Sequence, residues 1–185
     1  MIVMSIHGQT KGTEFEKQIG QIATMEAMGG MMYFSLARIA QDLGYEEVAK
    51  ELMGLGIQEA NHAGFYATLN GKYPKDEKKF WKLIKGLSCA EYKGETTLGK
   101  IAEALKANGL AEAAEDVSYF ALQEKHHGIK TQDIYDNYAP KEDGTPEKVY
   151  VCSVCGFVYE GDLDAEPDDY KCPLCGCAKG VFKLQ

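Results

Sequence analysis

Apolar positions recur at helical spacing through most of the first 138 residues. Between Thr13 and about Asn70 they follow the three-and-four spacing of one helix face, as in Ile22, Met25, Met32, Leu36 and Ile39. The stretch "DLGYEE" interrupts this pattern and divides the span into two helices. At its start, "TEFE" predicts a capping box in which Thr13 caps the helix and Glu16 reaches back to it.

A second pair of helices is predicted after the loop-like stretch "NGKYPKDEKK", with Asp76 as a helix cap. These helices span about 80–107 and 110–138, with a break at "NGL". Beyond them, two prolines, a glycine and several charges predict a linker over 140–148. The segments "KVYVC", "GFVYEG" and "GVFKLQ" then predict short strands. We therefore expect a mainly α protein with a helical domain at 1–139 and a small β-rich domain at 149–185.

Composition narrows the class of protein. The 185 residues are 45% hydrophobic and 26% charged, and no apolar run approaches the roughly 20 residues of a membrane span. The net charge of −8 argues against nucleic acid as a partner. Because the first residues lack a basic stretch and a small-residue cleavage site, we expect a cytoplasmic location.

The helical part contains an internal repeat. Residues 26–62 align with 91–127 without a gap, which pairs Glu26 with Glu91, Gly29 with Gly94, Glu59 with Glu124, and His62 with His127. The two halves are the same helical hairpin written twice.

The paired glutamates and histidines predict a metal site. Residues at i and i+3 share a helix face, so each Glu-x-x-His, at 59–62 and 124–127, offers an oxygen and a nitrogen to one side. Adding Glu26 and Glu91 gives the ligand set of a ferritin-like di-iron four-helix bundle. A lone Glu-x-x-His in a charged helix means little, because Glu is a common surface helix former. Two copies in register favour the metal site.

Two further residues are candidates at this site. Glu95 lies one turn after Glu91, where the first hairpin has Gly30. It is predicted as an additional carboxylate ligand, the alternative being a solvated side chain beside Lys93. Tyr33, two turns after Glu26, is predicted to hydrogen-bond a ligand carboxylate.

Cysteines define a second metal site. Five of the six lie in the last 34 residues, and Cys152, Cys155, Cys172 and Cys175 form two CxxC motifs, each followed by glycine. Four thiolates at this spacing predict a tetrahedral iron or zinc site. Two disulfides are the weaker alternative in a chain without an export signal. Cys177 is expected to be a small residue in a turn.

This combination resembles the rubrerythrin family over essentially the whole chain, with "CSVCGFVYEG" and "CPLCG" similar to its rubredoxin-like domain. The resemblance implies a peroxidase that reduces hydrogen peroxide to water in oxidative-stress defence. Its cofactors would be two irons in the bundle and one in the four-cysteine site. Electrons would come from NAD(P)H through a reductase or rubredoxin.

The same resemblance implies roles for single residues. Glu26, Glu59, Glu91, Glu124 and His127 match the family's iron ligands, and His62 matches the histidine that exchanges with a carboxylate. The family's exchanging carboxylate lies three residues after the third-helix Glu, where this chain has Gly94, so Glu95 is expected to take that role. The resemblance also implies a homodimer in which the cysteine module serves the di-iron site of the partner chain.

Two other functions fit parts of the sequence. The bundle could be a ferroxidase or iron-handling protein that uses O2, although such a protein gains little from a dedicated electron input. Alternatively, the tail could be a zinc ribbon that binds a protein partner, which would leave the duplicated carboxylates without a purpose.

Overall fold

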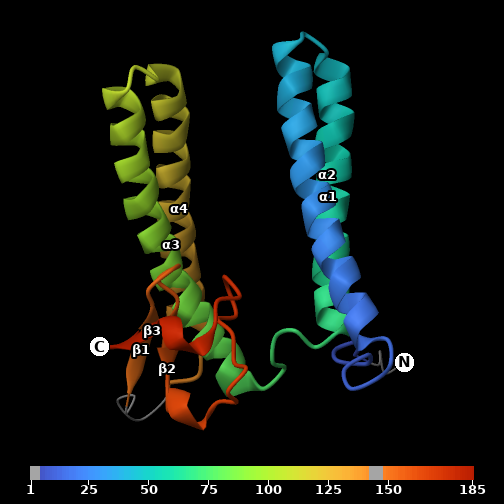
Figure 1. The fold of residues 1–185 in the computed structure, drawn as a ribbon, viewed down its shortest axis with the longest axis vertical. Coiled ribbons are helices and arrows are strands. Elements are labelled where there is room, and N and C mark those ends of the chain that lie inside the picture. The colour runs from blue at the N-terminus through green and yellow to red at the C-terminus, as the bar shows by residue number, and fades with distance from the viewer. Residues whose placement is uncertain (1–4, 142–147) are drawn as a thin grey trace. The chain divides into compact units, whose positions relative to one another are not determined.

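The computed structural model describes residues 5–141 and 148–185 and divides the chain into two compact units, Met1–Lys75 and Asp76–Gln185. The first unit is a helical hairpin of α1 (Glu16–Asp42) and α2 (Glu46–Leu69). The second contains the hairpin of α3 (Glu77–Ala107) and α4 (Ala111–Tyr138), followed by a small β-rich module (Figure 1). The predicted mainly α class with a C-terminal β-rich module is confirmed.

Both hairpins turn at repeat-related glycines. Gly44 follows α1 and Gly109 follows α3, each with a φ of 80°, a left-handed conformation that glycine adopts without strain at a helix end. The predicted breaks at "DLGYEE" and "NGL" are therefore confirmed.

Of the two helix-capping predictions, the one at α3 is confirmed and the one at α1 is wrong in detail. At α3 the Asp76 side chain accepts a hydrogen bond of 2.9 Å from the Lys79 backbone N–H, as expected. At α1 the capping box is wrong in detail, because the helix begins at Glu16 and has no side-chain cap. Glu16 instead accepts from the Gly12 N–H at 2.6 Å, and the Thr13 hydroxyl accepts from the Phe15 N–H at 3.2 Å. The N–H groups of Gly12 and Phe15 thus occupy the two side-chain acceptors that the capping box would have used.

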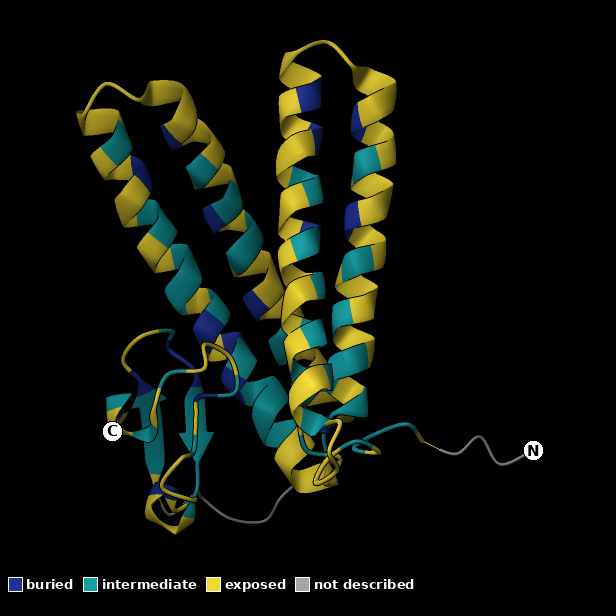
Figure 2. Ribbon diagram, turned by 45° about the vertical axis from the view of Figure 1, so that its right-hand side comes forward, coloured by how far each residue is buried: buried dark blue, intermediate teal, exposed yellow. Residues whose placement is uncertain are grey.

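Alanines hold each hairpin together. Ala37 and Ala49 are buried in the α1–α2 hairpin, and Ala102 and Ala114 are buried in the α3–α4 hairpin, all at 5% exposure or less. Their small side chains let the helix axes approach closely. Figure 2 shows that the buried stretches of these helices are short and that most of the helical ribbon is exposed or intermediate. Several large apolar residues of α1, among them Met25, are more than 40% exposed.

The C-terminal module contains a three-stranded antiparallel sheet in the order β2-β1-β3. Its strands are β1 (Val149–Cys152), β2 (Val158–Glu160) and β3 (Phe182–Leu184). Two short 3-10 helices, η1 (Leu163–Ala165) and η2 (Lys179–Val181), lie in the connection between β2 and β3. Most of the linker predicted at 140–148 falls on residues 142–147, outside the described residues, so the domain boundaries stay a prediction.

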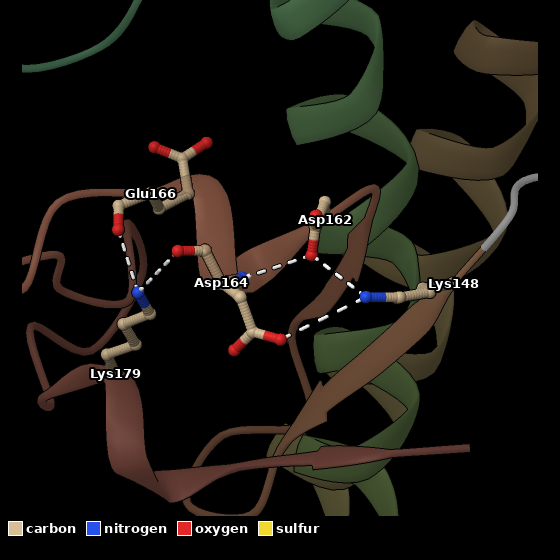
Figure 3. A network of polar contacts seen from close by, with 5 residues as sticks. All are labelled: Lys148, Asp162, Asp164, Glu166 and Lys179. Atoms are coloured by element: carbon tan, nitrogen blue, oxygen red, sulfur yellow. Dashed lines mark hydrogen bonds and ion pairs between the residues drawn. The ribbon is translucent and has the colours of Figure 1, made fainter.

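Lysines secure the long loop between β2 and β3 (Figure 3). Lys148 Nζ lies 3.0 Å from Asp162 Oδ1, which holds the pKa of Asp162 below its usual value. On the other side of the loop, Lys179 Nζ donates to the Glu166 carbonyl at 2.7 Å and to the Asp164 carbonyl at 3.4 Å. These bonds fix the loop that leads into the second CxxC motif.

None of the helices in the described part of the chain is both long and apolar enough to cross a membrane.

Candidate metal centres

The first hairpin gathers two carboxylates and an imidazole. Glu26 comes from α1, whereas Glu59 and His62 lie one turn apart on α2. The His62 Nδ1 atom is 3.6 Å from a carboxylate oxygen of each glutamate. One ligand atom from each residue lies within 4.8 Å of the other two. This distance suits three donors around one cation.

The second hairpin repeats the arrangement. Glu91 comes from α3, and Glu124 and His127 come from α4. The His127 Nδ1 atom lies 3.4 Å from Glu91 Oε2, and the three ligand atoms again lie within 4.8 Å of one another. The sequence repeat is thus also a repeat of the cluster.

Hydrogen bonding and burial raise the pKa of one carboxylate in each cluster. The pKa of Glu26 is raised, first by its hydrogen bond with Glu59 and then by burial. The pKa of Glu91 is raised chiefly by burial and then by the hydrogen bond with Glu124. A cation bound between two such neighbouring carboxylates would favour their charged forms and offset their mutual repulsion.

A glycine makes room for the second carboxylate of each cluster. At Gly94, an added Cβ would lie 2.9 Å from Glu124 Oε2, closer than real Cβ contacts allow. At the repeat-related Gly29, the nearest atoms would be those of the Glu59 carboxyl end at 3.5 to 3.6 Å. The repeat alignment pairs these glycines, but only the structure shows that they border the clusters, and more tightly at Gly94.

The donor chemistry of the two clusters fits iron. Carboxylate oxygens with imidazole nitrogen suit iron or manganese, and a Glu with a Glu-x-x-His from paired helices is the ligand set of di-iron carboxylate proteins. Each cluster is therefore a carboxylate and histidine candidate site for one iron.

Glu95 and Tyr33 lie differently from the six cluster residues. The Glu95 carboxylate is 3.5 Å from Lys125 Nζ in an ion pair across α3 and α4, and it is not among the groups of clustered ligands that the described residues form. Tyr33 is half-buried on α1. The roles of both residues stay predictions.

The four cysteines converge at one point of the module. The Sγ atoms of Cys152 and Cys175 are 3.8 Å apart, and those of Cys155 and Cys172 are 3.6 Å apart. A tetrahedral metal about 2.3 Å from each sulfur requires sulfur separations of about 3.8 Å. All four are free thiols, so the disulfide alternative is wrong. The site fits a four-thiolate metal, including the iron of rubredoxin-type centres.

Burial and backbone hydrogen bonds shift the pKa values of these thiols in different directions. Burial raises the pKa of Cys155 to about 11, and it also raises that of Cys172. Although burial opposes it, the backbone N–H of Cys177 and the neighbouring thiols lower the pKa of Cys175 to about 7. The Cys177 carbonyl also accepts a hydrogen bond of 2.8 Å from the backbone N–H of Cys172. Cys177 therefore contributes backbone bonds to the second CxxC turn.

The chain is similar in sequence to known proteins. A family model described as Rubrerythrin matches residues 21–135. An uncharacterized protein of Methanocaldococcus jannaschii is 29% identical over 131 residues, which cover 71% of this chain and 91% of the relative. Nigerythrin of Nitratidesulfovibrio vulgaris is 24% identical over 161 residues, covering 81% of this chain and 76% of its own. A solved structure of nigerythrin in a mixed-valence state covers 100% of this chain and 94% of its own at 21% identity, with a TM-score of 0.31.

Proposed function

Because this chain belongs to the rubrerythrin family, we propose that it is a di-iron peroxidase that reduces hydrogen peroxide to water. Membership in this family supports an iron-binding oxidoreductase with a ferritin-like helical part and a rubredoxin-like C-terminal part. The observation that supports peroxide reduction is the presence, in one chain, of two Glu-Glu-His clusters and a separate four-cysteine centre. A protein that only oxidises iron with O2 would gain little from that second centre.

The proposed ligands follow the clusters. Glu26, Glu59 and His62 would hold one iron, Glu91, Glu124 and His127 would hold the other, and Cys152, Cys155, Cys172 and Cys175 would hold the third. Bound iron supplies the two electrons that peroxide needs in H2O2 + 2H+ + 2e− → 2H2O. The chain's own carboxylates contribute by holding protons, since a hydrogen bond with Glu59 raises the pKa of Glu26, and burial followed by a hydrogen bond with Glu124 raises the pKa of Glu91.

The proposed catalytic residues are His62, Glu95 and Tyr33. The His62 side chain is 55% exposed, the highest value of the three residues in its cluster, so its ring has room to rotate out of the cluster. Glu95 must leave Lys125 before its carboxylate can act as a ligand. Electrons would come from NAD(P)H through a reductase or a rubredoxin, and a homodimer stays a prediction.

Stopped-flow oxidation of the anaerobically reduced protein tests this function. Hydrogen peroxide and O2 are supplied in separate experiments, and iron is counted per chain. About three irons per chain and much faster oxidation by peroxide are expected. Faster oxidation by O2 would favour the ferroxidase, and a colourless, zinc-loaded tail would rule out electron relay through the cysteines.

A further inference from the structure

One stripe of α3 carries the C-terminal module. Leu83, Gly86, Ala90 and Lys93 follow one another at intervals of three, four and three residues, so they share one face of the helix. We call these four residues the α3 seat. Both the seat and the module belong to the unit Asp76–Gln185.

The module and the seat share one apolar core. Ala90, only 7% exposed, belongs to the same buried cluster as Cys152, Phe157 and Cys172, and Leu83 packs against that cluster. Two of the four cysteine ligands thus lie in a core that α3 completes. Undocking would expose apolar surface of both the module and the helix, which opposes separation.

Gly86 permits the closest approach. A Cβ at this position would lie 2.5 Å from the Val158 carbonyl oxygen and 2.6 Å from the Phe157 ring. A glycine inside a helix costs about 1 kcal/mol relative to alanine, so local helix stability does not explain this residue. The close approach of β2 explains it.

Three lysines of α3 add polar contacts to the module. Lys82 Nζ donates to the Glu160 carbonyl at 2.7 Å, and Lys85 Nζ contacts the Glu160 carboxylate at 2.5 Å. Lys93 Nζ donates to the Ser153 carbonyl at 2.6 Å. Ser153 lies inside the first CxxC motif, so this bond fastens the cysteine turn itself.

Lys93 also links the module to the second metal cluster through α3. Its aliphatic chain covers Gly156, where an added Cβ would come within 2.6 Å of Lys93 Cδ. Glu91 lies two residues earlier on the same helical turn, and residues at i and i+2 point to different sides. The first cysteine turn is therefore held on the side of α3 away from the Glu91 carboxylate.

We propose that the four-cysteine module is docked on the α3 seat of its own chain, and that this seat holds the first CxxC turn at the level of Glu91 along α3, on a different side of that helix from the Glu91 carboxylate. That the docked module delivers electrons to the di-iron site rests on the proposed function. The docking itself does not depend on that function. This arrangement differs from the expected one, in which the module serves a partner chain. Gly86 and Lys93 are its positioning residues.

Zero-length carbodiimide cross-linking of the full-length, iron-loaded protein tests the docking. The reagent joins Lys85 to Glu160 only while they are in contact, and the Lys148 to Asp162 pair inside the module, 3.0 Å apart, is the internal control. We expect the Lys85 to Glu160 link in protein that runs at the mass of one chain on a denaturing gel. The proposal fails if this link occurs only in two-chain products, or is missing while the control link forms.

Substitutions in α3 provide a matched comparison. Gly86→Ala should lower the yield of the Lys85 to Glu160 link, and Gly86→Leu should lower it about tenfold. Gly99→Ala and Gly99→Leu are the controls, since nothing lies within 4 Å of a Cβ at Gly99 on the same helix. The control variants should keep the wild-type yield, and unchanged yield in both Gly86 variants would overturn the proposal. Neither readout uses peroxide, so the docking and the peroxidase function can fail separately.

Discussion

Replacing Gly94 by alanine should separate metal binding from helix stability. The added Cβ would lie 2.9 Å from Glu124 Oε2, and ordinary contacts begin at 3.4 Å, so the carboxylate must move by about 0.5 Å. The carboxylate is the far end of a flexible side chain, which makes the movement inexpensive for the fold. Alanine itself favours the helix by about 1 kcal/mol. We therefore expect unchanged or slightly higher stability of the metal-free protein.

Metal affinity should respond in the opposite direction. A displaced ligand or its support typically costs 10-fold to 100-fold in affinity, and we expect a loss of about that size for the Glu91, Glu124 and His127 cluster. Gly29→Ala is the matched control from the repeat, because its Cβ would meet Glu59 at an ordinary 3.5 Å. It should gain helix stability and keep its metal.

Calorimetric titration with Fe(II) under anaerobic conditions, alongside urea unfolding of the metal-free protein, measures both effects. The reasoning is refuted if Gly94→Ala binds iron as well as Gly29→Ala does. It is also refuted if Gly94→Ala lowers stability by more than the control, because the cost would then lie in helix packing and not in the position of a ligand.

Three further predictions concern other parts of the chain. His127→Ala should lose one of the two irons of the helical part, whereas His126→Ala, outside the described clusters, should lose none, as metal analysis will show. Metal binding needs thiolates, and Cys155 and Cys175 have pKa values of about 11 and about 7. Affinity of the cysteine site should therefore rise with pH, falling more than tenfold for each pH unit below about 7; a flat profile in competition titrations would contradict this. Asp76→Ala removes the cap of α3 and should cost about 1 kcal/mol in urea unfolding, with Lys75→Ala as the neutral control.

Much of the architecture could be predicted because its signals are local. Helical periodicity and turn glycines located four helices to within a few residues, and the CxxC spacing located the thiolate site. The failures are also local in origin. The capping box at Thr13 matched the sequence pattern, but its two side-chain acceptors bind the N–H groups of Gly12 and Phe15 instead, and the helix starts at Glu16.

The sequence by itself determined which residues could bind metal, because residue type and spacing along a helix decide which side chains share a face. It could not determine the distances between helices, which depend on how the small residues of both partners pack. Only the tertiary structure brought Glu91 to Glu124 and His127, and showed that Gly94 leaves room for a carboxylate. Contacts between residues far apart in the chain likewise decided the role of Gly86, since no local pattern distinguishes a glycine beneath a docked strand from one exposed to solvent.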